Sequence, residues 1–194
     1  PDMVRKSYWS AKKSDKQILY QLSVQNVEQE EEFLSGTFEK IRGRKAMTMR
    51  EDFCGTALSS AQFVKQDDQR LAVGYDLDTE VLAWGQKNNI DPLGDVAKQV
   101  KLLEKNVVSV SKRKFDICAA MNFSYFIFKK RQDLLKYYEC VYKSLNDDGI
   151  FVLDMYGGTE AQVVMEEERE IDEGFTYIWD QSSFNPITNE VVNH

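Results

Sequence analysis

Helix-like and strand-like patterns of apolar residues alternate along this chain. Over residues 15–41, in "DKQILYQLS" and "EQEEEFLSGTFEKI", apolar residues recur about every 3.6 positions and predict helix with an acidic solvent face. Short apolar runs predict strands at 45–51 and 70–76, and then in "QVKLLEKNV", "KFDICAAMN" and "GIFVLDMY". Between them, helices are predicted in "TALSSAQFVKQ", from Thr79 as N-cap to about Asn89, and in "RQDLLKYYECVYKSLN".

The C-terminal part predicts further elements. We expect a turn at Asn146–Gly149, one more helix in "AQVVMEEERE", and a β-hairpin in "FTYIWDQSSFNPITNEVVNH" that turns at Asn185-Pro186 and Asn189. Strands that are separated by helices, with continuous apolar runs, indicate βαβ units. The sequence therefore predicts the α/β class, as one domain with a doubly wound, mostly parallel sheet.

Composition narrows the classes of function. The chain has 194 residues, 42% of them hydrophobic, and a formal net charge of −7, which disfavours bulk nucleic acid as a partner. No apolar run is long enough to cross a membrane, and the start "PDMVRKSYWSAKKSDK" lacks the apolar segment of a signal peptide. We therefore predict a cytoplasmic protein without a membrane partner.

Cysteine and histidine usage excludes several kinds of site. Cys54, Cys118 and Cys140 are widely spaced, which indicates reduced and mostly buried thiols rather than a disulfide framework. The only histidine is the last residue, His194, which argues against a Ser-His-Asp triad and against a histidine-rich metal site. No metal site is predicted.

In a parallel sheet, ligands bind at the carboxyl ends of the strands, near the switch in strand order. That rule selects the loops at 51–57, 76–79, 104–107 and 120–126. The first contains neither the GxxxxGK[ST] of a P-loop nor the GxGxxG of a dinucleotide site. Asp76, at the end of a strand, can accept both hydroxyls of a ribose. For each residue a simpler interpretation exists: Gly55 as a turn, Asp76 as a helix cap and Cys54 as a core residue.

Three segments in order, "REDFCGTA", "VGYDLD" and "FDICAAMNFSYF", resemble class I S-adenosylmethionine-dependent methyltransferases from about residue 46 to 158. The phrases "LYQLSVQ", "NFSY", "LDMYGG" and "WDQSSFNPIT" are also similar to a branch of bacterial and plant-type methyltransferase-domain proteins. The resemblance implies a Rossmann-like sheet of seven strands. Five core strands and one hairpin are predicted here, so either 175–194 supply the last pair or the fold is incomplete at its C-terminus, which we favour.

The resemblance also implies a role for individual residues. Glu51 would orient the methionyl end of S-adenosylmethionine, Asp76 would bind the ribose hydroxyls, and Leu77 would pack on the adenine. The other implied cofactor-binding residues are Phe53, Cys54, Gly55, Thr56 and Ala57 around the amino-acid part, Asn106 and Val107 at the adenine edge, and Met121 and Asn122 beside the sulfonium.

Three positions depart from the family pattern. Phe53 and Ala57 stand where the family has glycines, and Asn106 where it frequently has an aspartate, so we expect a changed loop shape. For catalysis we predict Tyr125, in contact with the acceptor, and Asn122. Phe123, Tyr125 and Phe126 would form an aromatic wall, with core packing as the alternative for Phe126 and Phe128.

The predicted function is in-line methyl transfer from S-adenosylmethionine to an unidentified acceptor, with a small molecule favoured. Residues 1–44 would form a helical lid, 45–158 the cofactor-binding core, and 159–194 a helix and hairpin on the acceptor side. One alternative is a binding module that holds the nucleoside ligand without catalysis. Another is a short-chain dehydrogenase, because Tyr125 and Lys129 form YxxxK; the chain lacks the GxxxGxG loop of that family.

Overall fold

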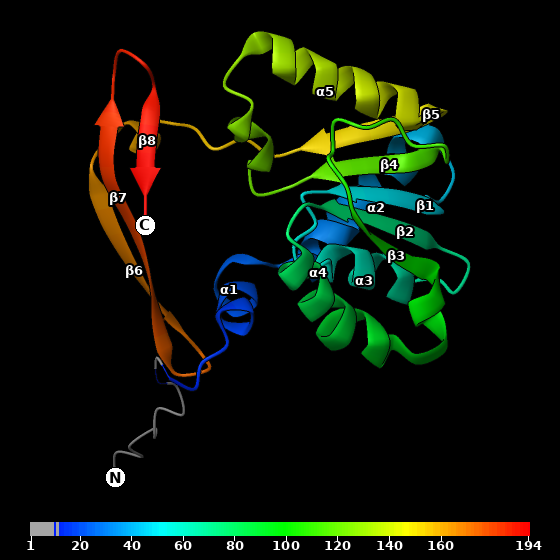
Figure 1. The fold of residues 1–194 in the computed structure, drawn as a ribbon, viewed down its shortest axis with the longest axis horizontal. Coiled ribbons are helices and arrows are strands. Elements are labelled where there is room, and N and C mark those ends of the chain that lie inside the picture. The colour runs from blue at the N-terminus through cyan, green and yellow to red at the C-terminus, as the bar shows by residue number, and fades with distance from the viewer. Residues whose placement is uncertain (1–9, 11) are drawn as a thin grey trace. The chain divides into compact units, whose positions relative to one another are not determined.

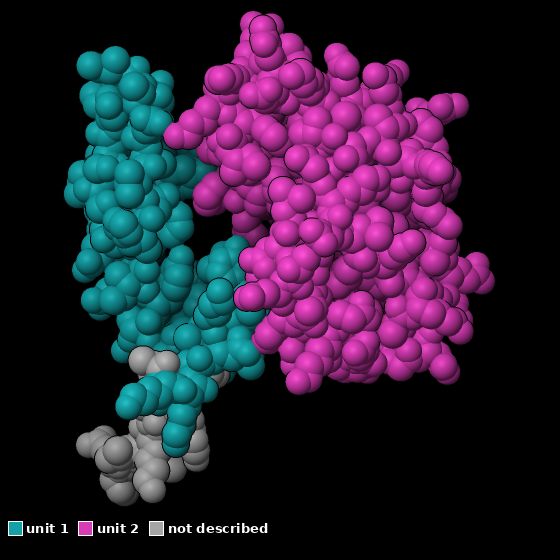
Figure 2. All heavy atoms as spheres, viewed as in Figure 1, with its two compact units in different colours: residues 1–26, 156–194 teal, residues 27–155 magenta. Residues whose placement is uncertain are grey.

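A computed structural model describes residue 10 and residues 12–194. The chain divides into two compact units, which Figure 2 distinguishes by colour: Val27–Met155, and Pro1–Asn26 together with Tyr156–His194. Of the predicted lid, residues 1–9 and 11 lie outside the described part of the chain.

The larger unit is built on a five-stranded parallel sheet (Figure 1). Its strands are β1 (Thr48–Asp52), β2 (Leu71–Asp76), β3 (Val100–Glu104), β4 (Phe115–Ala120) and β5 (Leu145–Leu153). They are ordered β3-β2-β1-β4-β5, and every neighbouring pair is parallel. The chain thus winds outward from β1 in one direction and then from β4 in the other, so the switch in strand order lies between β1 and β4.

Helices cover both faces of this sheet, which confirms the predicted doubly wound α/β class. On one face, α2 (Val27–Arg42), α3 (Leu58–Lys65) and α4 (Thr79–Gly85) share a buried apolar cluster with Met49 and Ile117 of the strands. On the other face, α5 (Arg131–Ser144) buries Tyr137 and Val141 against Cys118 of β4. Because side chains alternate along a strand, β2, β3, β4 and β5 each contribute to both clusters, whereas β1 contributes an apolar side chain only to the first.

Element ends differ from the sequence predictions in three places of this part of the chain. The predicted helix over 15–41 is two helices, α1 (Lys16–Val24) and α2, separated at Gln25–Asn26. The N-cap of α4 is Asp78 rather than Thr79, and the helix passes into a π-turn at Gln86–Ile90 and a 3-10 segment at Asp91–Gln99. The predicted turn at Asn146–Gly149 is wrong: these residues lie within β5, where the pairing with β4 jumps from Leu145 to Ile150 as in a bulge.

The smaller unit holds α1 and a three-stranded antiparallel sheet ordered β6-β7-β8. Its strands are β6 (Met165–Ile171), β7 (Phe175–Asn185) and β8 (Glu190–Asn193), preceded by a 3-10 turn at Glu160–Gln162. The hairpin prediction is confirmed by β7 and β8. The helix predicted in "AQVVMEEERE" is wrong, because the second half of that segment pairs with β7 as part of β6.

Gln181 of β7 is the most buried side chain of the smaller unit among the described residues. Its amide nitrogen Nε2 donates to the carbonyls of Glu160 (3.0 Å) and Val163, and its Oε1 accepts from the Tyr156 hydroxyl. One polar side chain therefore ties β7 to the segment that leads into β6.

Candidate functional site

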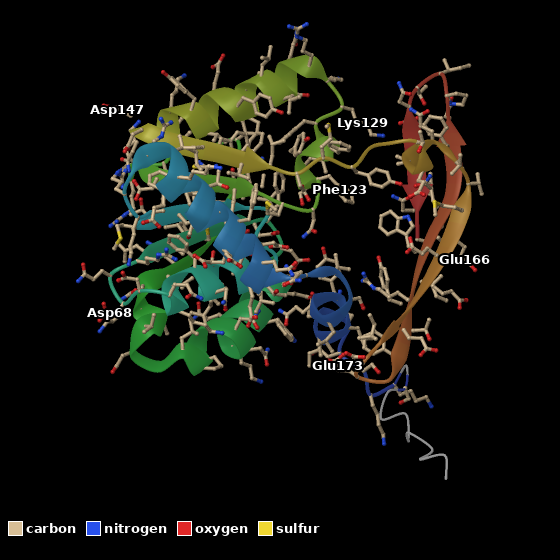
Figure 3. The ribbon with its side chains drawn as sticks, turned by 180° about the vertical axis from the view of Figure 1, so that it is seen from behind. Asp68, Phe123, Lys129, Asp147, Glu166 and Glu173 are labelled. Atoms are coloured by element: carbon tan, nitrogen blue, oxygen red, sulfur yellow. The ribbon has the colours of Figure 1, made fainter. Side chains whose placement is uncertain are left out.

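The sequence predicted a site at the carboxyl ends of the parallel strands. Figure 3 labels Phe123 and Lys129 at this end of the larger unit, and Asp68 and Asp147 at the opposite end. The loops that follow β1, β2 and β4 meet beside the switch in strand order, where α/β sheets generally bind their ligands.

The loop after β1 has an unusual backbone. Phe53, Gly55 and Ala57 all have positive φ, at 57°, 51° and 55°. Glycine adopts this conformation readily, whereas an L-residue loses about 1–2 kcal/mol in it. Phe53 and Ala57 therefore keep the backbone form that glycine favours, even though both carry a side chain. Packing holds them there: the Phe53 ring lies 5.9 Å from that of Tyr137, and Ala57 is fully buried.

Asp76 connects the end of β2 to this loop. Its Oδ2 accepts a hydrogen bond from the Gly55 amide (2.8 Å), and its Oδ1 accepts from the amides of Leu77 (2.8 Å) and Asp78 (3.0 Å). The carboxylate that caps α4 belongs to Asp78, which accepts from the amides of Glu80 and Val81. Helix capping therefore does not explain Asp76. Its Oδ1 already accepts from two amides and its Oδ2 from one, so Oδ2 keeps a lone pair for a further donor.

Glu51, on β1, is a buried carboxyl group. Only 7% of the residue is exposed, and its Oε2 accepts from both the amide (2.8 Å) and the hydroxyl (2.5 Å) of Ser60 on α3. The pKa of Glu51 is raised to about 7, mainly by burial and also by the nearby Glu30 and Asp76, while the hydrogen bonds from Ser60 act to lower it. No Lys or Arg in the described part of the chain forms an ion pair with Glu51 or Asp76. Negative charge thus gathers here without a basic partner.

The 53–57 loop is also pressed against α4. The Thr56 carbonyl accepts a hydrogen bond from Asn89 Nδ2 (2.8 Å), and a Cβ placed on Gly85 would lie 2.4 Å from that same carbonyl oxygen. Cys54 lies beneath the loop, 3% exposed, and burial strongly raises the pKa of its thiol. These contacts support the interpretation of Cys54 as a core residue.

The loop after β4 is held by an acid that the sequence analysis did not single out. Asn122 and Phe123 both have positive φ, and their amides donate to the two carboxylate oxygens of Asp154 at 2.9 and 2.6 Å. Asp154 directly follows β5, within the phrase "LDMYGG". A carboxylate immediately after a buried strand was the signal that could have found it.

Tyr125 lies in the core rather than on an open wall. It is 7% exposed, stacks edge-on against Phe126 at 5.0 Å, and burial raises the pKa of its phenol. Phe126 is 44% exposed, which does not fit core packing, whereas Phe128 packs against the buried cluster under α5. Tyr125 sits on a 3-10 turn (Ser124–Ile127), and Lys129 is exposed beyond that turn, so no common helix presents a tyrosine–lysine pair.

The residues predicted to contact the adenine differ in their exposure and in their partners. Leu77 is 64% exposed next to Asp76, as a surface for a flat apolar ring requires. Asn106 is exposed, but its Oδ1 already accepts from the Val108 amide (2.8 Å). Val107 is 5% exposed and belongs to the core cluster under α5. Met121, like Asn122, is half-buried at the end of β4.

Behind the site lies a buried ionic network that the sequence analysis missed. Arg50 is fully buried; its Nε contacts Asp52 Oδ1 at 2.7 Å, and its other nitrogens donate to Val107 O, Ser109 O and Ser144 Oγ. The Tyr137 hydroxyl donates to Asp52 Oδ2 at 2.9 Å. Because Arg50 and Asp52 are two apart on β1, they share the face opposite to Glu51. Two charges of opposite sign at alternate positions of a predicted strand were the available signal.

Metal sites and membrane spans are both absent from the described residues. Among them, no group of three or more His, Cys, Asp and Glu side chains could hold a metal ion. No helix in this part of the chain is long and apolar enough to cross a bilayer.

Comparison with known proteins identifies the fold. No protein-family model and no curated protein matches the sequence. Solved structures do match. One is an S-adenosylmethionine-dependent methyltransferase from Clostridium acetobutylicum (TM-score 0.69, 16% identity), which is covered over 68% of its length by 87% of this chain. Another is CalS10, an amino pentose methyltransferase from Micromonospora echinaspora (TM-score 0.70, 13% identity), covered over 71% by 92% of this chain.

A third similar structure is the sugar N-methyltransferase KedS8 from a Streptoalloteichus species, with a TM-score of 0.66 and 17% identity; 92% of this chain covers 69% of it. Structural matches at identities this low show the fold of the chain and not any reaction that it catalyses. The structural matches and the strand order β3-β2-β1-β4-β5 together show that the chain has the Rossmann-like fold of the class I S-adenosylmethionine-dependent methyltransferases.

Proposed function

We propose that this protein binds S-adenosylmethionine at the carboxyl ends of β1 and β2 and transfers its methyl group to a small-molecule acceptor. The observation that carries the proposal is the pair of acidic side chains Glu51 and Asp76 beside the 53–57 loop, neither of which forms an ion pair with a Lys or Arg among the described residues. S-adenosylmethionine has an ammonium and a sulfonium, both cationic, and two ribose hydroxyls. A buried charge gains most from a partner of opposite sign, so these carboxylates fit such a ligand.

In this proposal, different residues contact different parts of S-adenosylmethionine. Asp76 would accept from a ribose hydroxyl at Oδ2, through the lone pair that the backbone amides leave, and Leu77 would cover the adenine with its exposed side chain. Glu51 and the backbone of residues 53–57 would hold the amino-acid part. Met121 and Asn122 would border the reactive end, in a loop that Asp154 fixes.

When bound, S-adenosylmethionine supplies a methyl group that already carries its leaving group. The chain's own contribution would then be alignment and exclusion of water, effects that can supply roughly 7–11 kcal/mol in favourable cases. The low exposure of Glu51 and Tyr125 supports a site with little water. Tyr125 as an acceptor contact stays a prediction, since its side chain is buried.

The nature of the acceptor is proposed from what the similar structures are called. Two of them are named for methylation of an amino pentose or of a sugar nitrogen. A small molecule therefore fits better than bulk nucleic acid, which the net charge of −7 also disfavours.

A non-catalytic module that binds the same nucleoside ligand is the second candidate. The buried phenol of Tyr125 favours it, because the only predicted acceptor contact of ionisable type has a raised pKa and little exposure. The two candidates share the cofactor site and differ only in turnover.

The test is calorimetric titration with S-adenosylhomocysteine, with NADH and ATP as competing ligands. Asp76→Asn should weaken binding about 10–100-fold, because charge-assisted hydrogen bonds contribute about 1.5–3 kcal/mol. Asp78→Asn is the matched control: it removes the same charge two residues away, and asparagine still caps a helix.

Binding that only Asp76→Asn weakens would support the proposed cofactor site. An equal loss of affinity for S-adenosylhomocysteine in both variants, or tighter binding of NADH than of S-adenosylhomocysteine, would contradict the proposal. Turnover of S-adenosylmethionine with a panel of amines and sugars then separates the enzyme from the binding module, since the module would release no S-adenosylhomocysteine with any acceptor.

A further inference from the structure

The negative charge of this protein is concentrated in its last 39 residues. Apart from His194, residues 156–194 contain one basic side chain, Arg169, and no lysine. Their acidic side chains are Glu160, Glu166, Glu167, Glu168, Glu170, Asp172, Glu173, Asp180 and Glu190. Since the net charge of the whole chain is −7, residues 1–155 are close to neutral. A field of one sign raises the local concentration of ligands of the opposite sign, here of cations.

The smaller unit also contains a cavity of about 250 Å³. Two residues of α1, two of β6 and two of β7 line it: Ser23, Val24, Glu167, Arg169, Tyr177 and Trp179. In the antiparallel pair, Glu167 lies opposite Trp179, and Arg169 lies opposite Tyr177. These four side chains therefore share one face of the sheet, while Glu166 and Glu168 belong to the other; Figure 3 labels Glu166 there.

The two charged residues of the cavity differ in what they contact. Arg169 donates through Nη2 to the Ser23 carbonyl, and its guanidinium carbon lies 5.4 Å from the centre of the Tyr177 ring. The Glu167 side chain makes no hydrogen bond or ion pair with any described residue. Trp179 is half-buried, with its ring 5.9 Å from that of Tyr156. The charged group of the cavity without a partner among the described residues is thus a carboxylate beside an aromatic ring.

We propose that this cavity binds a small organic cation, a protonated amine on a compact apolar frame. A carboxylate and the face of an indole both attract an ammonium group, and the aromatic walls cover an apolar frame. Arg169 keeps its positive charge, but its guanidinium contacts the Ser23 carbonyl and the Tyr177 ring and does not pair with the Glu167 carboxylate. The volume lies near the lower end of ligand pockets, which selects a compact molecule.

This inference stands apart from the proposed methyl transfer, since it concerns the smaller unit alone and its test needs no S-adenosylmethionine. The probe is cyclohexylamine, which is a cation at pH 7, and cyclohexanol is its neutral counterpart of similar shape. Each is titrated into the full chain while binding is followed by calorimetry and by tryptophan fluorescence, with Trp179→Phe to assign the optical signal.

Two variants make the test specific to the cavity. Glu167→Gln should weaken cyclohexylamine binding about ten-fold, the effect expected for loss of one charge-assisted contact. Glu168→Gln removes an identical charge from the next residue, on the opposite face of β6, and should change binding less than about two-fold. Both side chains are exposed, so neither substitution should alter the thermal midpoint.

Saturable binding of the amine, lost in Glu167→Gln and kept in Glu168→Gln, would establish the site. Equal weakening in both variants would overturn it, because a diffuse field and not the cavity would then attract the cation. Equal binding of cyclohexanol would overturn the assignment of the ligand as a cation. Binding of a lysine-rich peptide without any binding of cyclohexylamine would also contradict it and would indicate a protein partner instead.

Discussion

At the scale of single residues, three acids at the ends of β1 and β2 have three different environments. Glu51 is buried against α3 and bonded by Ser60. Asp52, the next residue, faces the other side of the sheet and is paired with Arg50. Asp76 is partly accessible and held by backbone amides. The alternation of side chains along β1 explains why two neighbouring carboxylates take on separate roles.

Glu51 should make folding stability depend on pH in an unusual direction. Its pKa in the folded protein is about 7, above the 4.5 of an exposed carboxyl. The folded state therefore keeps a proton that the unfolded state releases, so stability from this group is full below about pH 4.5 and falls as pH rises to 7. The free energy of unfolding of Glu51→Gln, measured with urea relative to that of the wild type, should therefore rise by roughly 3 kcal/mol as the pH goes from about 4.5 to 8.

The comparison with Glu51→Gln isolates this one group from the other carboxyls, and Asp78→Asn serves as an exposed control that should show no such trend. A difference between wild type and Glu51→Gln that stays constant with pH would mean that Glu51 ionises normally in the folded protein.

At the scale of elements, the site depends on how closely α4 approaches the loop after β1. Gly85 is the residue that permits this approach, because a side chain there would collide with the Thr56 backbone. The loop in turn holds Gly55 within hydrogen-bonding distance of Asp76. A helix that contributes no side chain to the proposed cofactor contacts therefore determines their arrangement.

Gly85→Ala should destabilise the larger unit by about 1–3 kcal/mol, the usual effect of overpacking, and should weaken binding of S-adenosylhomocysteine. Gly36→Ala is a matched control: Gly36 lies in α2, and a Cβ placed on it would meet no atom within 4 Å, so alanine there should stabilise the helix by roughly 0.5–1 kcal/mol. Thermal unfolding and the same calorimetric titration measure both effects. Unchanged binding in Gly85→Ala would show that the loop can shift without consequence.

The sequence predicted the elements of the larger unit better than those of the smaller one. Apolar runs identified β2 to β5, because strands buried on both faces have few polar positions. The strand at β1 was predicted too, although Arg50, Glu51 and Asp52 within it are charged. The glutamate-rich stretch that forms β6 predicts a helix, since Glu favours helices and cross-strand pairing with β7 leaves no local signal. In the site, acids and glycine at strand ends were visible in the sequence. Asp154 is also such an acid, but its role in holding the amides of Asn122 and Phe123 depends on contacts formed only in three dimensions.

At the scale of the whole molecule, the two units differ in what holds them together. All the buried apolar side chains among the described residues belong to the larger unit, in two clusters on the two faces of its sheet. The buried residues described in the smaller unit are both polar, Ser23 and Gln181. Hydrogen bonds, rather than a dry apolar core, therefore carry much of the smaller unit's structure.

Hydrogen exchange should reveal this difference. Amides of β6, β7 and β8 are expected to exchange at least about ten-fold faster than those of β1 and β4, since local opening requires less energy where few apolar contacts are lost. Mass spectrometry of exchanged peptides from the intact chain measures both sets in one experiment. Equal protection of the two sheets would contradict the expectation and would point to a single cooperative unit.

The network of Arg50, Asp52 and Tyr137 has a consequence for how this sequence can change over evolutionary time. Loss of any one partner leaves a buried polar or charged group unsatisfied, at a cost of about 3–5 kcal/mol for a broken ion pair, whereas replacement of a whole buried set by apolar residues is often harmless. Intermediate sequences are thus less fit than either end point. Lineages descended from this protein should keep all three residues or replace them together.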